Sequence, residues 1–316
     1  MPSNSGMHKD DAPLLAVLIL TYNEEKHIGR CIDHVQAIAD EVFVIDSYSN
    51  DRTVEIARDK GATVLQNPFT NYAKQYQWAI EHAETRAQWL MRLDADEIVE
   101  PDLAAEIVEK LPWLDQDVTG INLKRKHIFM DRWLRHGGRY PLILLRIWRA
   151  GFGRIEDRWM DEHMFVTSGK TITFKGGFAD HNLNDLSFFT DKHNRYATRE
   201  AIDVIMQETN EDADSSILSS GKSPFQAKIK RFIKDKIFNA LPFEISTLFY
   251  FLFRYIFQLG FLDGRPGLIF TFLQGYWYRF LVGAKLVEIR RQTRDCTTRQ
   301  QLADRLTQIT GFDVKV

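Results

Sequence analysis

The stretch WLMRLDADE, Trp89–Glu97, decides how the rest of the chain is interpreted. A mostly apolar run ends abruptly in three carboxylates, Asp94, Asp96 and Glu97. A buried strand has this appearance when its carboxyl end delivers acidic side chains into a crevice. Because Asp94 and Asp96 are two residues apart, an extended chain would point both toward one face, where they can share a hard cation. The alternative is an Asp-rich turn that caps a helix beginning near Pro101.

The segment before this stretch alternates between expected strands and helices. Strands are expected at Leu14–Thr21, Val42–Asp46 and Ala62–Gln66, and helices at Glu25–Ala39, Thr53–Lys60 and Asn71–Ala83. In the first helix, apolar residues recur at spacings of three and four, which places them on one face. Strands that alternate with helices through short loops imply a mainly parallel sheet flanked by helices, an α/β arrangement.

Carboxylates are expected to gather at one edge of this sheet. In open parallel sheets, ligands bind beyond the carboxyl ends of the strands. The acids placed there are Glu24, Asp46, Asp51, Asp94 and Asp96. Separate helix caps would give the same set, but three acidic strand ends favour a shared site. No glycine-rich dinucleotide or P-loop motif follows the first strand, so a divalent cation that bridges carboxylates and a nucleotide diphosphate is the better prediction.

The composition of the 316-residue chain excludes some classes of protein. With 44% hydrophobic residues, 27% charged residues and a net charge of −2, neither disorder nor a general affinity for nucleic acid is expected. Two cysteines, Cys31 and Cys296, suggest reduced thiols in a cytosolic setting. Residues 1–12 are polar and lack the apolar core of a secretory signal, so we expect a mobile N-terminus.

The C-terminal part differs in character. Residues 224–316 contain 15 Lys+Arg and 7 Asp+Glu, whereas the preceding part is acidic. Gln226–Lys236 is a basic amphipathic segment, and Pro242–Val287 is rich in Phe, Tyr and Trp but interrupted by charges, without a clean run of about 20 apolar residues. Such a pattern is typical of helices that lie in a membrane interface containing anionic lipid. The alternatives are packing on the rest of the chain or another subunit, and a re-entrant hairpin turning at Leu262–Pro266.

Three motifs resemble a known family. TYNEE (Thr21–Glu25), VIDSYSNDRT (Val44–Thr53) and LDADE (Leu93–Glu97) are similar to the inverting family 2 glycosyltransferases of the GT-A fold. The segments His127–Gly151 and MDEH (Met160–His163) resemble the bacterial subgroup that contains lipopolysaccharide core β-1,4-glucosyltransferases. The resemblance covers roughly residues 16–201 and implies a Rossmann-like GT-A sheet.

The resemblance also implies roles for the acidic edge. The residues that would meet the nucleotide of the donor are Thr21, Tyr22, Asn23 and Glu24 at the nucleoside, Asp46 at the base or ribose, and Asp51 in support. Asp94 would approach the ribose or the metal, and Asp96 would be the principal ligand of Mn²⁺ or Mg²⁺. Two weaker candidates come from the residues themselves. Arg146 is expected to bind phosphate through its planar fork, and His181 either joins the metal shell or is structural.

A carboxylate on the acceptor side is expected to act as the catalytic base. Inverting transfer needs a group that takes the hydroxyl proton as the acceptor oxygen attacks the anomeric carbon. The resembling subgroup has His-Glu at this point, so Glu162 matches the base. Asp161 stands where His is usual, which leaves the assignment open between these neighbours, and both are otherwise exposed loop acids.

The sequence patterns predict four segments, and together with the family resemblance they imply one function. Residues 1–12 form the N-terminus, 13–223 a catalytic domain, 224–295 a membrane-associating helical region and 296–316 a tail. The predicted enzyme transfers a hexose from a UDP-sugar to a lipid-linked saccharide at the cytoplasmic face of the inner (plasma) membrane, in bacterial lipopolysaccharide or exopolysaccharide synthesis. The alternatives are a sugar-phosphate nucleotidyltransferase and a non-catalytic subunit that binds sugar nucleotides.

Overall fold

The computed structural model describes residues 12–156, 163–211 and 242–314. Contacts divide the chain into two compact units. Unit 1 runs to Leu183, except for the tripeptide His136–Gly138, which belongs with Asn184–Val316 in unit 2. Four predictions lie outside the described residues: the mobile N-terminus before residue 12, the domain boundary at residue 223, the basic segment 226–236, and the base, Glu162 or Asp161.

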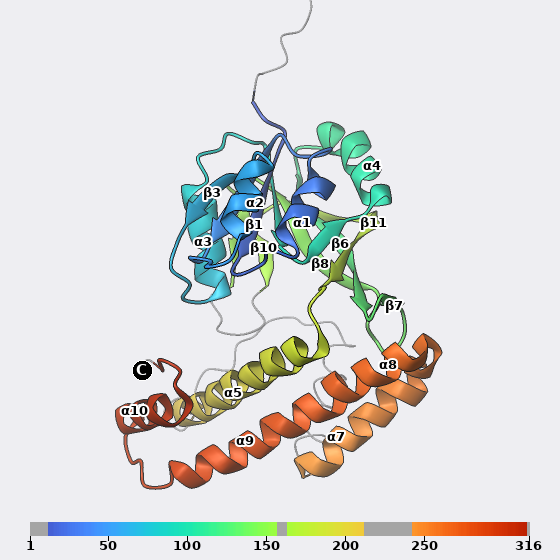
Figure 1. The fold of residues 1–316 in the computed structure, drawn as a ribbon. Helices are drawn as coiled ribbons and strands as arrows, with labels where there is room; N and C mark the ends of the chain where they lie inside the picture. Colours follow the sequence, from blue (N-terminus) through green and yellow to red (C-terminus); the bar gives the residue numbers. More distant parts are fainter. Residues whose placement is uncertain (1–11, 157–162, 212–241, 315–316) are drawn as a thin grey trace, which may run out of the picture. The chain divides into compact units, whose positions relative to one another are not determined.

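Unit 1 is built on one twisted sheet with the strand order β3-β2-β1-β4-β8-β6-β11-β5, and β7 pairs with β6 (Figure 1). The strands are β1 Leu15–Thr21, β2 Glu41–Asp46, β3 Thr63–Gln66, β4 Trp89–Asp94, β5 Glu97–Val99, β6 Val118–Phe129, β7 Arg132–Leu134, β8 Leu142–Arg149 and β11 Lys170–His181. Strands β3, β2, β1 and β4 are mutually parallel, whereas β8 runs antiparallel to both β4 and β6. The predicted α/β class is confirmed, and the second half of the sheet is mixed.

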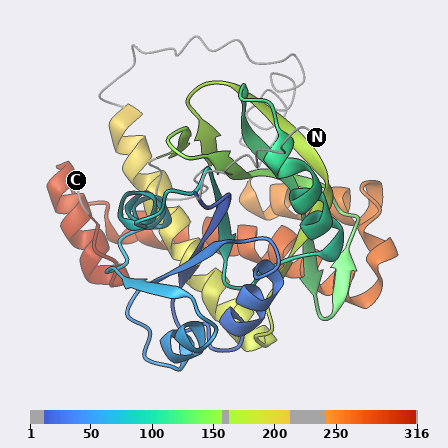
Figure 2. The same cartoon turned by 90° about the horizontal axis from the view of Figure 1, so that it is seen from above.

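Helices cover both faces of the parallel half (Figures 1 and 2). They are α1 Ile28–Val35, α2 Thr53–Asp59 and α3 Tyr72–His82, whereas α4 Pro101–Lys110 packs against β11 in the mixed half. Strand β9 Gly153–Ile155 pairs with β10 Met164–Val166 in a separate ribbon. Successive residues of β1 point to opposite faces. Val17 and its neighbours pack with α1, α2 and α4, while Leu18 and its neighbours pack with α3. All of β1 is buried, as expected of a central parallel strand.

Three local interpretations need correction. The first helix is confined to Ile28–Val35, because Glu24–His27 form a turn before it. The chain is not extended through the acidic stretch, since β4 ends at Asp94 and residues 95–96 turn before β5. The capping alternative is also wrong, because α4 begins after Glu100, which makes no side-chain capping bond.

Unit 2 is helical. Its elements are α5 Leu186–Glu211, α7 Phe243–Leu252, the π-helical turn η3 Phe253–Phe257, η4 Gly260–Asp263, α8 Gly264–Phe270, the π-helical turn η5 Thr271–Trp277, α9 Tyr278–Gln292 and α10 Arg299–Thr310. The helix α7 returns alongside η5 and α9, so the aromatic region forms a hairpin. The sequence placed a boundary at residue 223, which is not described, whereas the contacts group α5 with unit 2.

The membrane-crossing potential of these helices is limited by their length and composition. Within the described ranges, no single helix is long and apolar enough to cross a bilayer. The pair Phe243–Phe257 and Gly260–Gln292 passes that test together, with a bend of 71° between its members.

A buried contact between α4 and β11 fixes the strand that ends at His181. The Gly176 N–H donates to Glu106 Oε2 at 2.8 Å, and Lys110 Nζ donates to Glu106 Oε1 at 2.7 Å. Gly176 lies so close to α4 that a Cβ there would be 2.5 Å from Leu103 Cα. Burial by itself would raise the pKa of Glu106, but the Gly176 N–H and Lys110 hold the pKa below its ordinary value.

We expect Glu106→Ala to lower the free energy of unfolding by about 1–3 kcal/mol, because the buried Gly176 N–H loses its acceptor. Glu106→Gln keeps an acceptor and should cost less. Since the folded-state pKa of Glu106 is depressed, its charge stabilises the fold above the unfolded pKa, and this contribution is lost as pH falls. Urea unfolding of wild type and Glu106→Gln at several pH values measures the contribution of the Glu106 charge to the free energy of unfolding. If the difference in free energy between the two proteins is the same in acid as at neutral pH, the charge does not contribute in this way.

Candidate active site

Two loops at the carboxyl edge of the sheet are joined by hydrogen bonds. The Asn23 N–H donates to Ser49 Oγ at 2.8 Å, and the Asn50 N–H donates to Asn23 Oδ1 at 2.9 Å. The Glu24 N–H donates to Thr53 Oγ1 at 2.7 Å. Asn23 has φ of 54°, a left-handed conformation that Asn tolerates better than most residues. The loops after β1 and β2 therefore form one preorganised surface.

Asp46 and Asp51 stabilise this surface through hydrogen bonds to residues of the two loops. Asp46 is fully buried and accepts hydrogen bonds from the Ser49 N–H, Ser49 Oγ, Thr21 Oγ1 and Gln66 Nε2. An ionised carboxylate has about four lone-pair sites, so its accepting capacity is used within the protein. Asp51 accepts from the Thr53 N–H and hydroxyl and from the Glu25 N–H. In this structure both carboxylates shape the loops that present Tyr22 and Asn23.

Two aromatic side chains project from the joined loops. Tyr22 is 57% exposed and Tyr48 is 56% exposed. Tyr48 has φ of 62°, which is unusual for an aromatic residue. Below them, Glu24 Oε2 lies 2.5 Å from His27 Nδ1, while His27 Nε2 accepts from the Leu183 N–H at 2.8 Å. Because His27 Nε2 accepts a hydrogen bond, the proton of the neutral ring is on Nδ1. His27 therefore donates to Glu24 and orients the Glu24 carboxylate.

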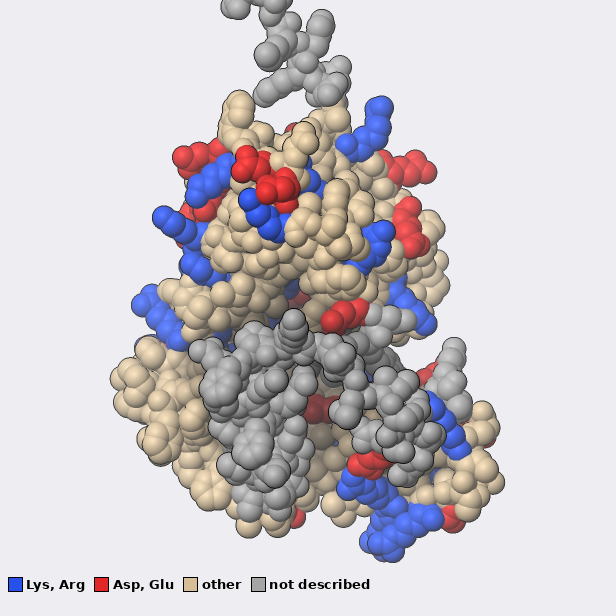
Figure 3. Space-filling view, turned by 180° about the vertical axis from the view of Figure 1, so that it is seen from behind, with Lys and Arg blue, Asp and Glu red and all other residues tan. Residues whose placement is uncertain are grey.

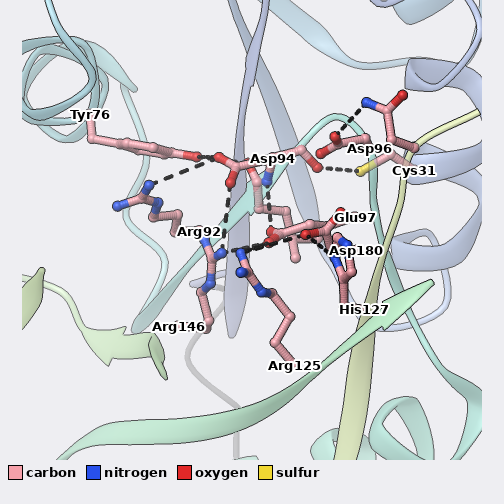
Figure 4. Close-up of polar contacts among 12 residues, drawn as sticks. Cys31, Tyr76, Arg92, Asp94, Asp96, Glu97, Arg125, His127, Arg146 and Asp180 are labelled. Atoms are coloured by element: carbon pink, nitrogen blue, oxygen red, sulfur yellow. Dashed lines mark hydrogen bonds and ion pairs between the residues drawn. The ribbon is translucent and has the colours of Figure 1, made fainter. Parts of the chain in front are cut away.

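The first acid of the D-x-D pair is held by three side chains (Figure 4). The Tyr76 hydroxyl lies 2.7 Å from Asp94 Oδ1, and the Arg146 and Arg92 guanidiniums lie 3.7 and 4.0 Å from its carboxylate. The Arg92 guanidinium also stacks 3.9 Å from the centre of the Tyr76 ring. Burial alone would raise the pKa of Asp94, but Arg92 and Arg146 hold it below its ordinary value. Asp94 is therefore an oriented, ionised carboxylate, one third exposed.

Glu97 lies below Asp94 and is almost completely buried. Its Oε1 is 2.6 Å from Arg146 Nη2, and its Oε2 accepts from the Asp94 N–H at 3.0 Å. Burial raises the pKa of Glu97, and the charge of Arg146 opposes this rise without cancelling it. Arg146, only 3% exposed, therefore supports the acidic turn in this structure and presents no open face to a phosphate.

Asp180 extends the charged network onto β11. His127 Nδ1 lies 3.0 Å from Asp180 Oδ2, and Arg125 Nη1 lies 3.8 Å from both Asp180 and Glu97. Burial alone would raise the pKa of Asp180, but His127 and Arg125 hold it well below its usual range. The network connects β4, β6, β8 and β11, which makes the acidic turn rigid.

Asp96 and His181 are brought together at the end of β11. The His181 N–H donates to the Asp96 carbonyl at 3.0 Å, and the Asn182 amide donates to Asp96 Oδ2 at 2.9 Å. His181 Nδ1 lies 3.3 Å from Arg30 Nη1, and its Nε2 lies 3.6 Å from Asp131 Oδ1. Burial, followed by the charge of Arg30, lowers the pKa of His181 and favours the neutral ring that metal coordination requires.

These side chains fit a divalent cation that is bound mainly by its substrate. In the part of the chain that the structure describes, no three His, Cys, Asp or Glu side chains converge as a metal site. Mg²⁺ in phosphate-transfer sites often takes one or two carboxylates and completes its shell with phosphate oxygens and water. Asp96 and Asp94, with neutral His181 beside Asp96, offer that donor set.

The residues that support these acids were not found from the sequence. They are Tyr76, Arg92, Arg125, His127, Asp180, Asn182, Arg30 and His27. One signal was available, since Arg92 is a charge within an otherwise apolar buried strand and must therefore have a partner. The other contacts join positions far apart in the chain. Of the predicted site residues, Thr21, Tyr22, Asn23, Glu24, Asp46, Asp51, Asp94, Asp96, Arg146 and His181 all lie in unit 1.

Comparison with known proteins identifies the family. The model of glycosyl transferase family 2 matches residues 16–181, just over half of the chain. An uncharacterized glycosyltransferase of Rickettsia bellii is 40% identical over 93 residues, 29% of this chain and 31% of that protein. A low-salt glycan biosynthesis hexosyltransferase of Haloferax volcanii is 41% identical over 93 residues, 28% and 22% of the two chains. The match to the first of these relatives thus spans about a third of its length.

The solved structures similar to this chain include glucosyl-3-phosphoglycerate synthase from Mycobacterium tuberculosis in complex with Mn²⁺, UDP and glucosyl-3-phosphoglycerate. The identity is 23%, the TM-score is 0.31, and 36% of this chain and 44% of that chain are covered. The family match covers the strands and loops that form the acidic edge, from β1 to β11. The chain belongs to glycosyl transferase family 2, and the predicted GT-A type of α/β fold and class of enzyme are confirmed at the level of the family.

We expect Arg146→Met to destabilise unit 1 by about 3–5 kcal/mol at alkaline pH, because Glu97 and Asp94 lose a buried cation. The loss should be smaller in acid, since the raised pKa of Glu97 lets a proton replace the guanidinium. In the double variant Arg146→Met/Glu97→Gln, the cost of Arg146→Met should shrink at alkaline pH and change little in acid, where Glu97 is already protonated. Urea unfolding of the four proteins measures this cycle. If Arg146→Met lowered the free energy of unfolding equally in the wild type and in Glu97→Gln at alkaline pH, Arg146 and Glu97 would not be coupled.

Proposed function

We propose that the chain is an inverting glycosyltransferase that transfers a hexose from a UDP-sugar to a lipid-linked saccharide during bacterial lipopolysaccharide or exopolysaccharide synthesis. The observation that carries this proposal is the oriented pair Asp94 and Asp96 beside the joined loops after β1 and β2. The loops supply Tyr22 and Asn23 for the nucleoside, and the acids face the place where the diphosphate would be held. The finer likeness to lipopolysaccharide core β-1,4-glucosyltransferases is carried by the motifs His127–Gly151 and Met160–His163.

The chemistry divides between the two sides of the site. Bound Mn²⁺ or Mg²⁺ would offset the charge that develops on the departing diphosphate. Asp96, oriented by Asn182, would hold it together with Asp94, and neutral His181, at the end of β11, is joined to Asp96 through the backbone. Glu162, or its neighbour Asp161, would take the acceptor hydroxyl proton as that oxygen forms its bond to the anomeric carbon and the bond to the β-phosphate breaks. UDP leaves from the opposite face, which inverts the anomeric centre.

We also propose that unit 2 associates with the cytoplasmic face of the inner membrane, as a peripheral or monotopic element. The support is an exposed apolar stripe on α7 and η3, whose members recur at helical spacing: Ile245, Leu248, Phe249, Phe253, Ile256 and Phe257. It continues around the hairpin turn through Leu259, Phe261, Leu262, Leu268 and Phe272. Phe257 is 75% exposed. Soluble surfaces seldom expose contiguous apolar patches of this kind without a partner.

The charged side chains of unit 2 are unevenly distributed on the face that Figure 3 draws. Figure 3 shows mostly uncharged side chains at the hairpin end of unit 2, and Lys and Arg at the end where α9 finishes. The exposed Arg290 and Arg291 lie in the last turn of α9. Apolar rings beside cations favour a bilayer interface with anionic lipid as the partner.

We expect Asp96→Ala to lower kcat/KM for sugar transfer by at least about 100-fold, since even a residue that only orients a metal ligand contributes 10–100-fold. The variant should also lose the extra thermal stabilisation that Mn²⁺ adds to UDP in the wild type. Asp33→Ala, at an exposed acid paired with Lys60, is the matched control.

A panel of nucleotide sugars assayed with Mn²⁺ identifies the donor. Release of pyrophosphate in place of UDP would identify a nucleotidyltransferase, and binding without turnover a non-catalytic subunit.

We expect Glu162→Gln to reduce turnover by about 10²–10⁴-fold, as loss of a general base does, while leaving UDP binding with Mn²⁺ intact. Asp161→Asn is the comparison that separates the two neighbours. A larger loss in Asp161→Asn would move the role of base to Asp161. Turnover near wild type in both variants would remove the base from this motif.

A further inference from the structure

Three side chains of unit 2 form a cationic cluster outside the candidate active site. Tyr250 lies on α7, Arg254 lies one turn later in η3, and Arg279 lies on α9. The Arg279 guanidinium is 4.0 Å from the centre of the Tyr250 ring, and the Arg254 guanidinium is 5.7 Å from it. Two helices of the hairpin thus bring two positive charges to one phenol.

The ion pairs within the described residues of unit 2 involve other cations. Within the described part of unit 2, neither Arg254 nor Arg279 forms an ion pair with Asp or Glu, whereas His136 pairs with Asp263 and Arg290 pairs with Glu208. Arg254 is only 6% exposed, and its Nε donates to the Gly137 carbonyl at 2.6 Å. Burial lowers the pKa of Arg254, the interaction with Tyr250 opposes that shift, and the charge of Arg279 adds a smaller lowering. A buried cation beside a second cation is costly unless an anion completes the cluster.

The cluster is bordered by a glycine and remains accessible through Arg279. Gly275 in η5 stands against the Tyr250 ring, at a distance where a Cβ would only just touch it, 4.0 Å away. Arg254 and Gly275 both lie in π-helical turns, a backbone form that recurs at functional sites. Arg279 is exposed, so its guanidinium can be reached from solvent or from a membrane surface. The planar forks of arginine match the oxygens of a phosphate, and the Tyr250 hydroxyl can donate a further bond.

We propose that Tyr250, Arg254 and Arg279 bind the phosphate group of a membrane lipid. The lipid is favoured over a soluble phosphate because the same α7 and η3 carry the exposed stripe, with Phe249 and Phe253 directly beside Tyr250 and Arg254 in sequence. Apolar side chains would enter the acyl region while the cationic cluster meets the phosphates at headgroup depth. This inference rests on the proposed membrane association of unit 2 and adds a specific site to it.

The test compares two substitutions that keep the charge. Arg279→Lys removes the fork but keeps the cation, and Arg291→Lys makes the same change 12 residues farther along α9, about 18 Å away. Binding of the full-length proteins to phosphatidylcholine vesicles, with and without phosphatidylglycerol, is measured by co-sedimentation. We expect Arg279→Lys and Tyr250→Phe each to weaken binding to the anionic vesicles about fivefold or more, and Arg291→Lys to bind as wild type does. Thermal unfolding confirms that each variant is folded.

Other outcomes would overturn the site. Equal binding of Arg279→Lys, Arg291→Lys and wild type would mean that anionic lipid is attracted by diffuse charge alone. If inorganic phosphate stabilises the wild type but not Arg279→Lys, while vesicle binding is equal in the two, the ligand is a soluble phosphate and the lipid assignment is wrong. If no protein binds any vesicle, membrane association fails as well. Donor binding and turnover, measured with soluble UDP-sugar, remain a separate test of the proposed enzyme activity.

Discussion

The candidate active site depends on one buried ion pair, between Arg146 on β8 and Glu97 at the start of β5. It joins an antiparallel strand of the sheet to the turn that follows β4. The same guanidinium reaches toward Asp94, and the Asp94 N–H returns to Glu97. Removing two charges from water is costly, so the pair is weak evidence of net stability. Its effect is geometric, since the turn can adopt few other conformations while both charges are buried.

That geometry separates the acids of the stretch into distinct roles. Glu97 and Ala95 are buried, whereas Asp94 and Asp96 remain partly exposed. Asp94 is surrounded by Tyr76, Arg92 and Arg146 and stays ionised. Asp96 lies beside Asn182 and His181. His181 ends β11, the strand that Glu106 anchors through Gly176. A cation held by only one or two carboxylates needs those carboxylates in fixed positions, because its remaining ligands come from the substrate. The charged network supplies that rigidity without contributing ligands.

The sequence predicted the edge of the sheet but not the interactions behind it. Buried parallel strands have continuous apolar runs, so β1, β2 and β4 were located to within a residue, together with the acids that follow them. Arg146 was predicted to meet phosphate because nothing in a sequence indicates that Glu97, 49 positions away, takes its charge first. Asp46 illustrates the same limit, since its donors include Gln66 from the neighbouring strand. Hydrophobic periodicity predicts local helices and strands. The partners of a side chain on other strands depend on strand order, and periodicity carries no information about strand order.

A buried charge needs an opposing charge, and the two units differ in how this need is met. In unit 1, buried Arg146 meets carboxylates of the protein, so its charge is satisfied and acts on the shape of the acidic turn. In unit 2, the partners of buried Arg254 are a backbone carbonyl and a phenol, which offer dipoles but no full negative charge. A guanidinium in apolar surroundings retains its proton and therefore retains the need for an anion. The position of Arg254 beside an exposed apolar stripe is why we propose a lipid phosphate as that anion.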